Sequence, residues 1–402
     1  MSKIGWVDAI KAFGCCACVV LSACSTLSQM ELDATEEDAT HYVRNGNLSA
    51  EVEALAQPLV EHGETTGIVV GVLLPDGSTQ FFGYGVTKKE GGTTPDENTI
   101  FATGSLSKGF LGAVTALLVR EGVLSWDDTL GKLLPPTTPL SVDAKKITLL
   151  QLATHTSRLP NQPLTFQTFR YFVEYLFTGN NFYRHFNRDY VFNYLADFKA
   201  PTEADVHYSS LGYALLSYAL EQRTGLSVDV LVERKILQPL GLKNTGYIPE
   251  ALPGNVSRAQ GHVGDEPKFI ARGTPVPDWQ FTELMRGSAA LYSNAKDLLT
   301  FAAVHLSRNQ TTFTAALTDT LQVRVPKPKD APAIAWFVDD VDGQHITYQV
   351  GMVAGFAGYV GLDVERRTAV VVLQNSFNWI DKVGHKLLVR LGRALPKVAI
   401  IN

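Results

Sequence analysis

The stretch ATGSLSKGFLGAVTALLVREG, residues 102–122, places a serine and a lysine three positions apart at the start of an apolar helix. Apolar residues then recur at helical spacing, and Gly122 marks the expected end of the helix. Residues three apart share one helix face, so the Lys108 side chain is expected beside the Ser105 hydroxyl. Burial of the first turn lowers the pKa of a lysine, and a lysine that is neutral for part of the time can accept a proton from serine. The stretch predicts Ser105 as a nucleophile and Lys108 as its base.

A second serine and lysine have the same spacing, so spacing alone does not identify the nucleophile. Ser293-Asn-Ala-Lys296 also begins a predicted helix. Asp297 follows Lys296 directly, which favours a charged and solvated lysine. We therefore interpret Ser293 as structural and expect it to be the N-cap of that helix.

Other catalytic classes find little support in the sequence. It contains no G-x-S-x-G, H-E-x-x-H, G-x-x-x-x-G-K-[ST] or G-x-G-x-x-G pattern. All four cysteines lie within the first 24 residues, so the rest of the chain has no thiolate metal site and no cysteine nucleophile. His155 and His207 are expected to be structural or surface residues. A serine acyl-transfer enzyme without a histidine partner, a metal or a cofactor fits this pattern best.

The composition indicates a globular protein with a sizeable core. The chain has 402 residues, is 45% hydrophobic and carries a formal net charge of −5. Its basic residues form no dense run, which argues against nucleic acid as a partner. The sequence gives no indication of the oligomeric state.

The first segment reads as an export signal. Lys3 and Lys11 precede an apolar stretch, residues 12–21, that is too short to span a bilayer. It ends in Leu-Ser-Ala-Cys24, which resembles the bacterial lipobox, so Cys24 is expected to carry a lipid that anchors the protein to a membrane. The alternative is an ordinary secretory signal cut near Ala23. We expect a signal peptide over 1–23, a flexible polar tether over 24–47, and a periplasmic or cell-envelope location.

The remaining chain, residues 48–395, is expected to form one α+β domain. Predicted strands lie near both ends of this region, at 67–74, 79–86, 333–338, 346–350, 357–362 and 368–374. Predicted helices lie at 108–121, 148–154, 210–224, 228–237 and 295–307, and a last helix runs from about 383 to 391. This order implies an antiparallel sheet built from both chain ends and flanked by helices, with a mainly helical lobe inserted at about 105–310 and a cleft between the two.

Aromatic residues are dense between positions 166 and 198. A substrate groove lined by rings and a buried core of the helical lobe are both compatible with this density. We favour the buried core.

Several motifs together resemble the family of class C serine β-lactamases and the related penicillin-binding DD-peptidases and esterases. Phe101-x-x-x-Ser105-x-x-Lys108 is similar to the nucleophile motif of that family. Further similarities are LLQLATHTSRL at 149–159, PLGL at 239–242 and GSAALYS at 287–293. The resemblance runs from about residue 67 to residue 392 and implies the β-lactamase/transpeptidase-like fold.

The resemblance also assigns the other site residues. Tyr208-Ser-Ser210 stands where the family has Y-x-N, which implies that Tyr208 relays protons and that Ser210 replaces a substrate-binding asparagine. Gln349-Val350-Gly351 stands where the family has K-T-G on a strand, so the family's cation is missing at Gln349. By the same resemblance, Val350 and Gly351 bind substrate, and the Met352 N–H forms an oxyanion hole with the Ser105 N–H.

The resemblance implies an exported serine hydrolase that forms an acyl-enzyme on Ser105. Its expected substrates are D-Ala-D-Ala peptides of peptidoglycan, with β-lactams as mimics. A carboxylesterase of the same fold and a catalytically silent muropeptide-binding lipoprotein remain as alternatives. The true acyl donor and the deacylation rate stay open.

Overall fold

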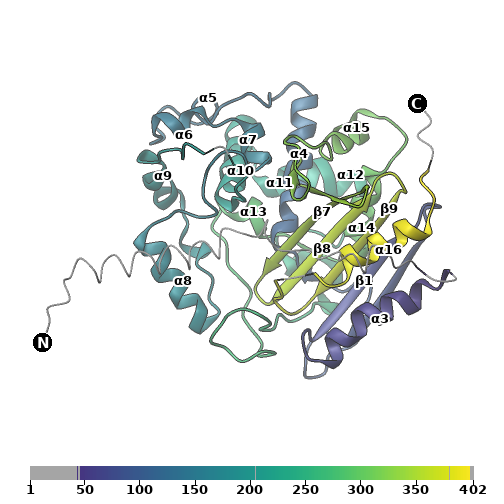
Figure 1. Cartoon of the computed structure of the whole chain (residues 1–402). Helices are drawn as coiled ribbons and strands as arrows, with labels where there is room; N and C mark the ends of the chain where they lie inside the picture. Colours follow the sequence, from purple (N-terminus) through teal and green to yellow (C-terminus); the bar gives the residue numbers. More distant parts are fainter. Residues whose placement is uncertain (1–42, 44–45, 204, 380, 399–402) are drawn as a thin grey trace, which may run out of the picture.

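A seven-stranded antiparallel sheet forms the centre of the protein (Figure 1). The computed structural model describes residues 43, 46–203, 205–379 and 381–398. The strand order is β2-β1-β9-β8-β7-β6-β5, so two strands from the first part of the domain join five from its last part. The strands are β1 (Gly67–Leu73), β2 (Thr79–Gly85), β5 (Ala331–Pro332), β6 (Phe337–Val341), β7 (Gln344–Val353), β8 (Phe356–Asp363) and β9 (Thr368–Gln374). This confirms the predicted α+β fold with a sheet completed by both chain ends.

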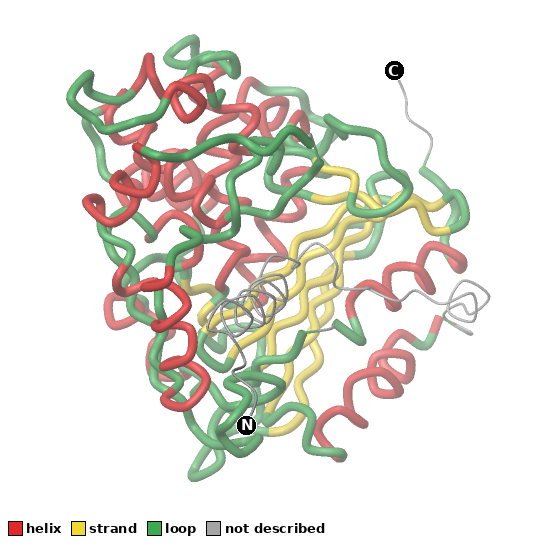
Figure 2. The backbone as a smooth tube through the Cα atoms, turned by 60° about the vertical axis from the view of Figure 1, so that its left-hand side comes forward, coloured by secondary structure: helices red, strands yellow, loops and turns green. Residues whose placement is uncertain are grey.

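Both faces of the sheet are covered by helices (Figure 2). Alternate residues of a strand point to opposite faces, and β1 is buried along its whole length. Ile68 and Val70 pack with α3 (Leu48–Glu61) and α16 (Gly384–Ala394), whereas Val69 packs toward the inserted lobe. The β-branched run GIVVGVL therefore suits a strand with a core on each side.

The inserted lobe is mainly helical and is built around α4. Every residue of this helix from Ser107 to Leu118 is buried, and Phe110 stacks on Phe301 of α14 with ring centroids 4.1 Å apart. A small second sheet joins β3 (Phe101–Ala102) to β4 (Tyr292–Ser293). The helices are α4 (Ser107–Arg120), α5 (Leu130–Leu133), α6 (Val142–Lys146), α7 (Leu149–Ala153), α8 (Phe166–Thr178), α9 (Arg188–Ala196), α10 (Ser210–Thr224), α11 (Val228–Val232), α12 (Gln238–Leu240), α13 (Arg286–Ala289), α14 (Ala295–His305) and α15 (Thr312–Asp319).

Two predicted elements differ in the structure. Of the strand expected at 333–338, only residues 337–338 belong to a strand, at the start of β6. Residues 333–336 connect β5 to β6, because the backbone turns there and Ala335 adopts a left-handed φ of 67°. There Ala335 N–H donates to the Ala153 carbonyl of α7, so the segment bonds to the helical lobe instead of extending a strand. The helix expected at 228–237 ends at Val232 and continues as a π-helical turn over Glu233–Leu237.

The N-terminal predictions concern residues that the structure hardly describes. Cys24 and the predicted signal peptide lie outside the described residues, and so does most of the predicted tether. Asn47 is described, and its side chain caps α3 by accepting a hydrogen bond from the Ala50 N–H. Within the described ranges, no helix is both long enough and apolar enough to cross a membrane.

Candidate functional site

The predicted nucleophile lies on a tight turn that leads directly into α4. Ser105 is 7% exposed and belongs to the one-turn 3-10 helix Gly104–Leu106. Gly104 has a φ of 54°, and a Cβ at this position would lie 2.7 Å from the Met352 carbonyl oxygen. Glycine is therefore required both for the turn and for the close passage of β7. The same passage brings the Met352 backbone next to the nucleophile turn.

Lys108 is buried and directed at Ser105. Its Nζ lies 2.9 Å from Ser105 Oγ, 2.9 Å from the Ser288 carbonyl oxygen and 3.4 Å from Ser210 Oγ. The side chain is 2% exposed, and no carboxylate is paired with it among the described residues. Burial lowers the pKa of Lys108 well below its usual range. A neutral Lys108 is thus available to accept the Ser105 proton.

Tyr208 is buried beside Lys108, but burial shifts its pKa in the opposite direction. Burial raises the pKa of its phenol, and the neighbouring Ser105 hydroxyl only partly opposes that rise. Lys108 Nζ lies 4.9 Å from the centre of the Tyr208 ring. Within the described part of the chain, no hydrogen bond of good geometry reaches the Tyr208 hydroxyl. The phenol therefore keeps its proton, which suits a proton donor or relay rather than the first base.

The two histidines have different surroundings, and neither lines the cavity beside Ser105. His155 is buried, its Nδ1 accepts a hydrogen bond from the Ser209 N–H at 3.0 Å, and its ring stacks on Tyr208 with centroids 4.5 Å apart. Burial lowers the pKa of His155, so the ring is neutral. The His155 ring thus packs against the Tyr208 ring, whereas His207 is exposed.

Ser210, which stands in place of the family's asparagine, has an amide neighbour from another segment. Its N–H donates to Asn161 Oδ1 at 3.0 Å. Asn161 and Gln162 both line the cavity beside Ser105. These two residues were not predicted from the sequence, although only Pro160 separates them from the LLQLATHTSRL stretch that carried the resemblance. The cavity therefore keeps amide groups despite the serine at position 210.

The residues of the third motif lie on β7 beside the nucleophile turn. A Cβ at Gly351 would lie 2.1 Å from the Thr103 carbonyl oxygen, so only glycine fits there. Gln349 is 5% exposed, and its amide covers Gly109 of α4, where a Cβ would lie 2.4 Å from Gln349 Nε2. Gln349 and Val350 share a small internal cavity with Lys108 and Tyr208. Their predicted contact with substrate stays a prediction, because they do not line the larger cavity.

The larger cavity opens beside Ser105 and encloses about 750 Å³, including its mouth. Its described walls are largely aromatic, and Glu266 is the one lining residue among them with a formal charge. The lining residues are Ser105, Asn161, Gln162, Phe172, Tyr175, Phe182, Tyr183, Ser210, Glu266, Trp279, Ala289, Met352, Phe377 and Trp379. Four of these come from the aromatic stretch at 166–198 and also belong to the buried core, so core and groove are not alternatives here.

The second serine and lysine pair has a different environment. The prediction that Ser293 is a helix N-cap was wrong: Asn294 caps α14 by accepting from the Asp297 N–H, while Ser293 lies on β4. The Ser293 hydroxyl lies 2.7 Å from Thr245 Oγ1. Lys296 is exposed, whereas Lys108 is buried. The two serine and lysine pairs thus have the same spacing, but the burial of the lysine distinguishes them.

The arrangement is suited to acyl transfer. Lys108 can take the Ser105 proton while Ser105 Oγ attacks an acyl carbon, and Tyr208 can pass a proton to the leaving group. The Ser105 and Met352 N–H groups are the predicted oxyanion donors, and one such donor stabilises the transition state by about 3 to 4 kcal/mol. Among the residues described, no three His, Cys, Asp or Glu side chains gather in a way that suits a metal ion.

Known proteins share this sequence pattern and fold. The family model described as Beta-lactamase matches residues 52–392. D-alanyl-D-alanine-carboxypeptidase/endopeptidase AmpH of Escherichia coli (strain K12) is 25% identical over 341 residues, which cover 80% of this chain and 82% of that protein. The crystal structure of a class C beta-lactamase in complex with cefoxitin matches 87% of this chain and 100% of its own, with a TM-score of 0.72 and 20% identity. D-alanine carboxypeptidase AmpC from Burkholderia cenocepacia matches 86% and 99%, with a TM-score of 0.69 and 20% identity. The two structures support the fold.

Proposed function

Because this chain belongs to the Beta-lactamase family and is a serine hydrolase, we propose that it is an exported enzyme acylated on Ser105 by D-Ala-D-Ala peptides of peptidoglycan or by β-lactams. The observation that carries the proposal is the 2.9 Å contact between Ser105 Oγ and the buried Lys108 Nζ. The substrate class is supported by the similarity to AmpH, which is named a D-alanyl-D-alanine carboxypeptidase and endopeptidase.

The proposed reaction proceeds through a covalent intermediate. Ser105 Oγ attacks the carbonyl carbon of the scissile amide while Lys108 accepts the hydroxyl proton. The carbon–nitrogen bond then breaks, and the leaving nitrogen receives a proton by way of Tyr208. Water next attacks the ester carbon and gives a proton to the Lys108 and Tyr208 pair. The bond between that carbon and Ser105 Oγ then breaks, the pair passes the proton to Ser105 Oγ, and the acid product leaves. The lowered pKa of Lys108 and the raised pKa of Tyr208 favour these separate roles.

Mass spectrometry of the intact protein tests acylation and distinguishes the candidate functions. After brief exposure to benzylpenicillin, we expect a mass increase equal to the whole inhibitor, located on the peptide that contains Ser105. A short-chain p-nitrophenyl ester should give the corresponding acyl adduct. No adduct and no turnover with either compound would support the silent binding protein instead, although the intact contact between Ser105 and Lys108 argues against it.

A carboxylesterase is the second candidate, and the charge of the cavity favours it. No lysine or arginine is among the described residues that line the cavity, and the single charged group there is the carboxylate of Glu266. Gln349 stands at the position of the family's cation and covers Gly109. A substrate carboxylate thus lacks a cationic partner, whereas a neutral ester needs none. The acylation residues are the same in both candidates.

We therefore expect turnover of small neutral esters to equal or exceed turnover of penicillin. Gln349→Lys should raise the ratio of penicillin to ester kcat/KM by roughly 10- to 100-fold, since a charge-assisted hydrogen bond contributes about 1.5 to 3 kcal/mol. This prediction requires the longer lysine side chain to extend from the small cavity that Gln349 shares with Lys108 and Tyr208 to the substrate bound beside Ser105. Gln349→Met is the matched control, because it keeps the length without the charge. An efficient wild-type penicillinase whose ratio does not change in the lysine variant would contradict this role of position 349.

Export and anchoring are part of the proposal, and the lipid anchor depends on Cys24, which lies beyond the described residues. Cys24→Ala should move the protein from the membrane fraction to the soluble fraction, because a lipid-modified cysteine is the predicted anchor. Cys18→Ala, within the apolar stretch, is the control and should leave the protein in membranes. Soluble wild-type protein cut near residue 23 would support the ordinary secretory signal, and sedimentation of Cys24→Ala with membranes would exclude the lipid anchor.

A further inference from the structure

Glu266 places a carboxylate with one unpaired oxygen in the wall of the cavity beside Ser105. It is partly buried, and its Oε2 atom is inaccessible and makes no hydrogen bond with any described residue. Burial raises the pKa of Glu266, and this effect exceeds the opposing effects of Lys268. The proposed acylation steps do not use this group. An inaccessible carboxylate oxygen without a partner costs stability, so a function in ligand binding would explain its presence.

The surroundings of Glu266 suit a positively charged ligand group. Seven aromatic side chains line the same cavity, and aromatic ring faces attract ammonium groups. These side chains are Phe172, Tyr175, Phe182, Tyr183, Trp279, Phe377 and Trp379. Aromatic faces combined with one carboxylate are the common elements of an ammonium site. A ligand carboxylate would be repelled by the Glu266 carboxylate and by the negative faces of the aromatic rings.

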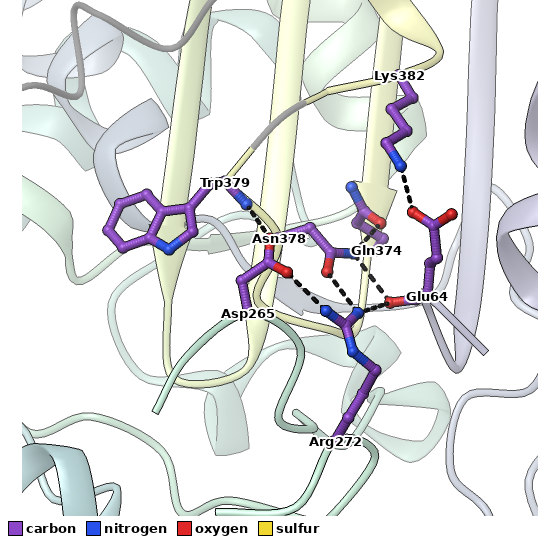
Figure 3. Close-up of polar contacts among 7 residues, drawn as sticks. All are labelled: Glu64, Asp265, Arg272, Gln374, Asn378, Trp379 and Lys382. Atoms are coloured by element: carbon purple, nitrogen blue, oxygen red, sulfur yellow. Dashed lines mark hydrogen bonds and ion pairs between the residues drawn. The ribbon is translucent and has the colours of Figure 1, made fainter. Parts of the chain in front are cut away.

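A polar network fixes the two segments that carry Glu266 and Trp379 (Figure 3). The neighbouring Asp265 accepts a hydrogen bond from the Trp379 N–H at 2.9 Å, and its other oxygen pairs with Arg272 at 2.6 Å. The Asp265 N–H donates to the Phe377 carbonyl oxygen at 2.6 Å. Asp265 therefore holds Glu266 beside the segment that supplies two of the aromatic rings.

The network continues to the start of the sheet, as Figure 3 also shows. Arg272 Nη1 donates to the Glu64 carbonyl oxygen at 3.2 Å, and Asn378 Nδ2 donates to the same oxygen at 3.1 Å. Asn378 Nδ2 also donates to Gln374 Oε1 at 3.0 Å. The wall of the cavity is thus tied to the segment before β1 and to the end of β9. The backbone that carries Glu266 is therefore preorganised, which limits the entropy lost when a ligand binds.

We propose that Glu266 is a specificity-determining residue that binds a primary ammonium group of the substrate. The preferred acyl donors are then peptides, β-lactams or esters that carry a free amine. This inference rests on the proposed function, because it concerns the cavity that serves Ser105. The cavity would thus favour substrates that carry an ammonium group, in addition to lacking a cation that binds a substrate carboxylate.

Two pairs of compounds that differ by one amine test the inference. Ampicillin carries an α-ammonium group that benzylpenicillin lacks, and p-nitrophenyl 6-aminohexanoate carries a terminal ammonium group that the hexanoate ester lacks. We expect the wild type to prefer the amine in at least one pair when acylation rates are compared. Glu266→Gln should reduce that preference roughly 10-fold or more, because a neutral amide cannot neutralise an ammonium group. The thermal unfolding midpoint shows whether the variant is folded.

Glu283→Gln is the matched control, because it removes one exposed carboxylate of the same lobe that does not line the cavity. It should keep the wild-type preference for the amine. Acylation of Ser105 without an amine preference in either pair would overturn the inference and leave the proposed function intact. The same holds if the preference survives in Glu266→Gln. No acylation by any of the four compounds would overturn the proposed function, and the inference would fall with it.

Discussion

Ser105→Ala should abolish covalent labelling by penicillins and esters and lower kcat by roughly 10⁴-fold or more, the loss typical of removing a nucleophile. The acyl-enzyme needs an oxygen at this position, and Lys108 Nζ lies 2.9 Å from it. The fold should tolerate the change, because the backbone conformation that requires glycine belongs to Gly104 and not to Ser105. Intact-mass analysis after exposure to benzylpenicillin, together with ester turnover, measures both effects.

Ser293→Ala is the matched control, because Ser293 belongs to the second serine and lysine pair with the same spacing. It removes the hydrogen bond to Thr245 and should lower the free energy of unfolding by about 1 kcal/mol while labelling persists. Equal labelling of the wild type and Ser105→Ala would show that Ser105 is not the nucleophile. Loss of labelling in Ser293→Ala alone would transfer that role to Ser293.

The sheet was largely predictable because its strands carry strong local signals. The runs GIVVGVL and TAVVVLQ become β1 and β9, which pair directly and are buried along their whole length. The segment at 333–338 is as apolar as a strand, yet Ala335 bonds to Ala153 of α7. That bond joins residues far apart in sequence, so no local pattern indicates it. The strand prediction from local sequence failed at this segment because a hydrogen bond to a distant residue determines the backbone conformation.

The site was predictable only where motifs mark it. The spacing of Ser105 and Lys108 anticipates their contact, and the resemblance points to Tyr208 and to β7. Part of the cavity wall comes instead from loops without a periodic pattern. Asn161 reaches it from the loop after α7, and Glu266 from the loop before α13. A carboxylate oxygen without a partner is recognisable only when its three-dimensional neighbours are known.

Lys108→Met should lower the rate of acylation by roughly 10²- to 10⁴-fold, the range that general base catalysis contributes. Methionine keeps an unbranched chain of similar length and removes the group that accepts the Ser105 proton. The variant should fold, because the replaced nitrogen is buried and no carboxylate pairs with it among the described residues. Acylation by a p-nitrophenyl ester, followed by release of p-nitrophenol, measures the rate. An unchanged rate in folded Lys108→Met would show that Lys108 is not the base.

The pH dependence of acylation separates the two candidate bases. The active form of Lys108 is deprotonated, so the rate should rise with pH until the pKa of Lys108 and then level off. Burial lowers that pKa, which extends the plateau to a pH well below the usual lysine value of 10.5. Burial raises the pKa of Tyr208, so a tyrosine base would require a rise above pH 10. In Tyr208→Phe the rate should fall while the rise stays at the same pH, and Lys108→Met should lose the rise. A rise that disappears in Tyr208→Phe and persists in Lys108→Met would assign the base to Tyr208, because the titrating group would then be the phenol.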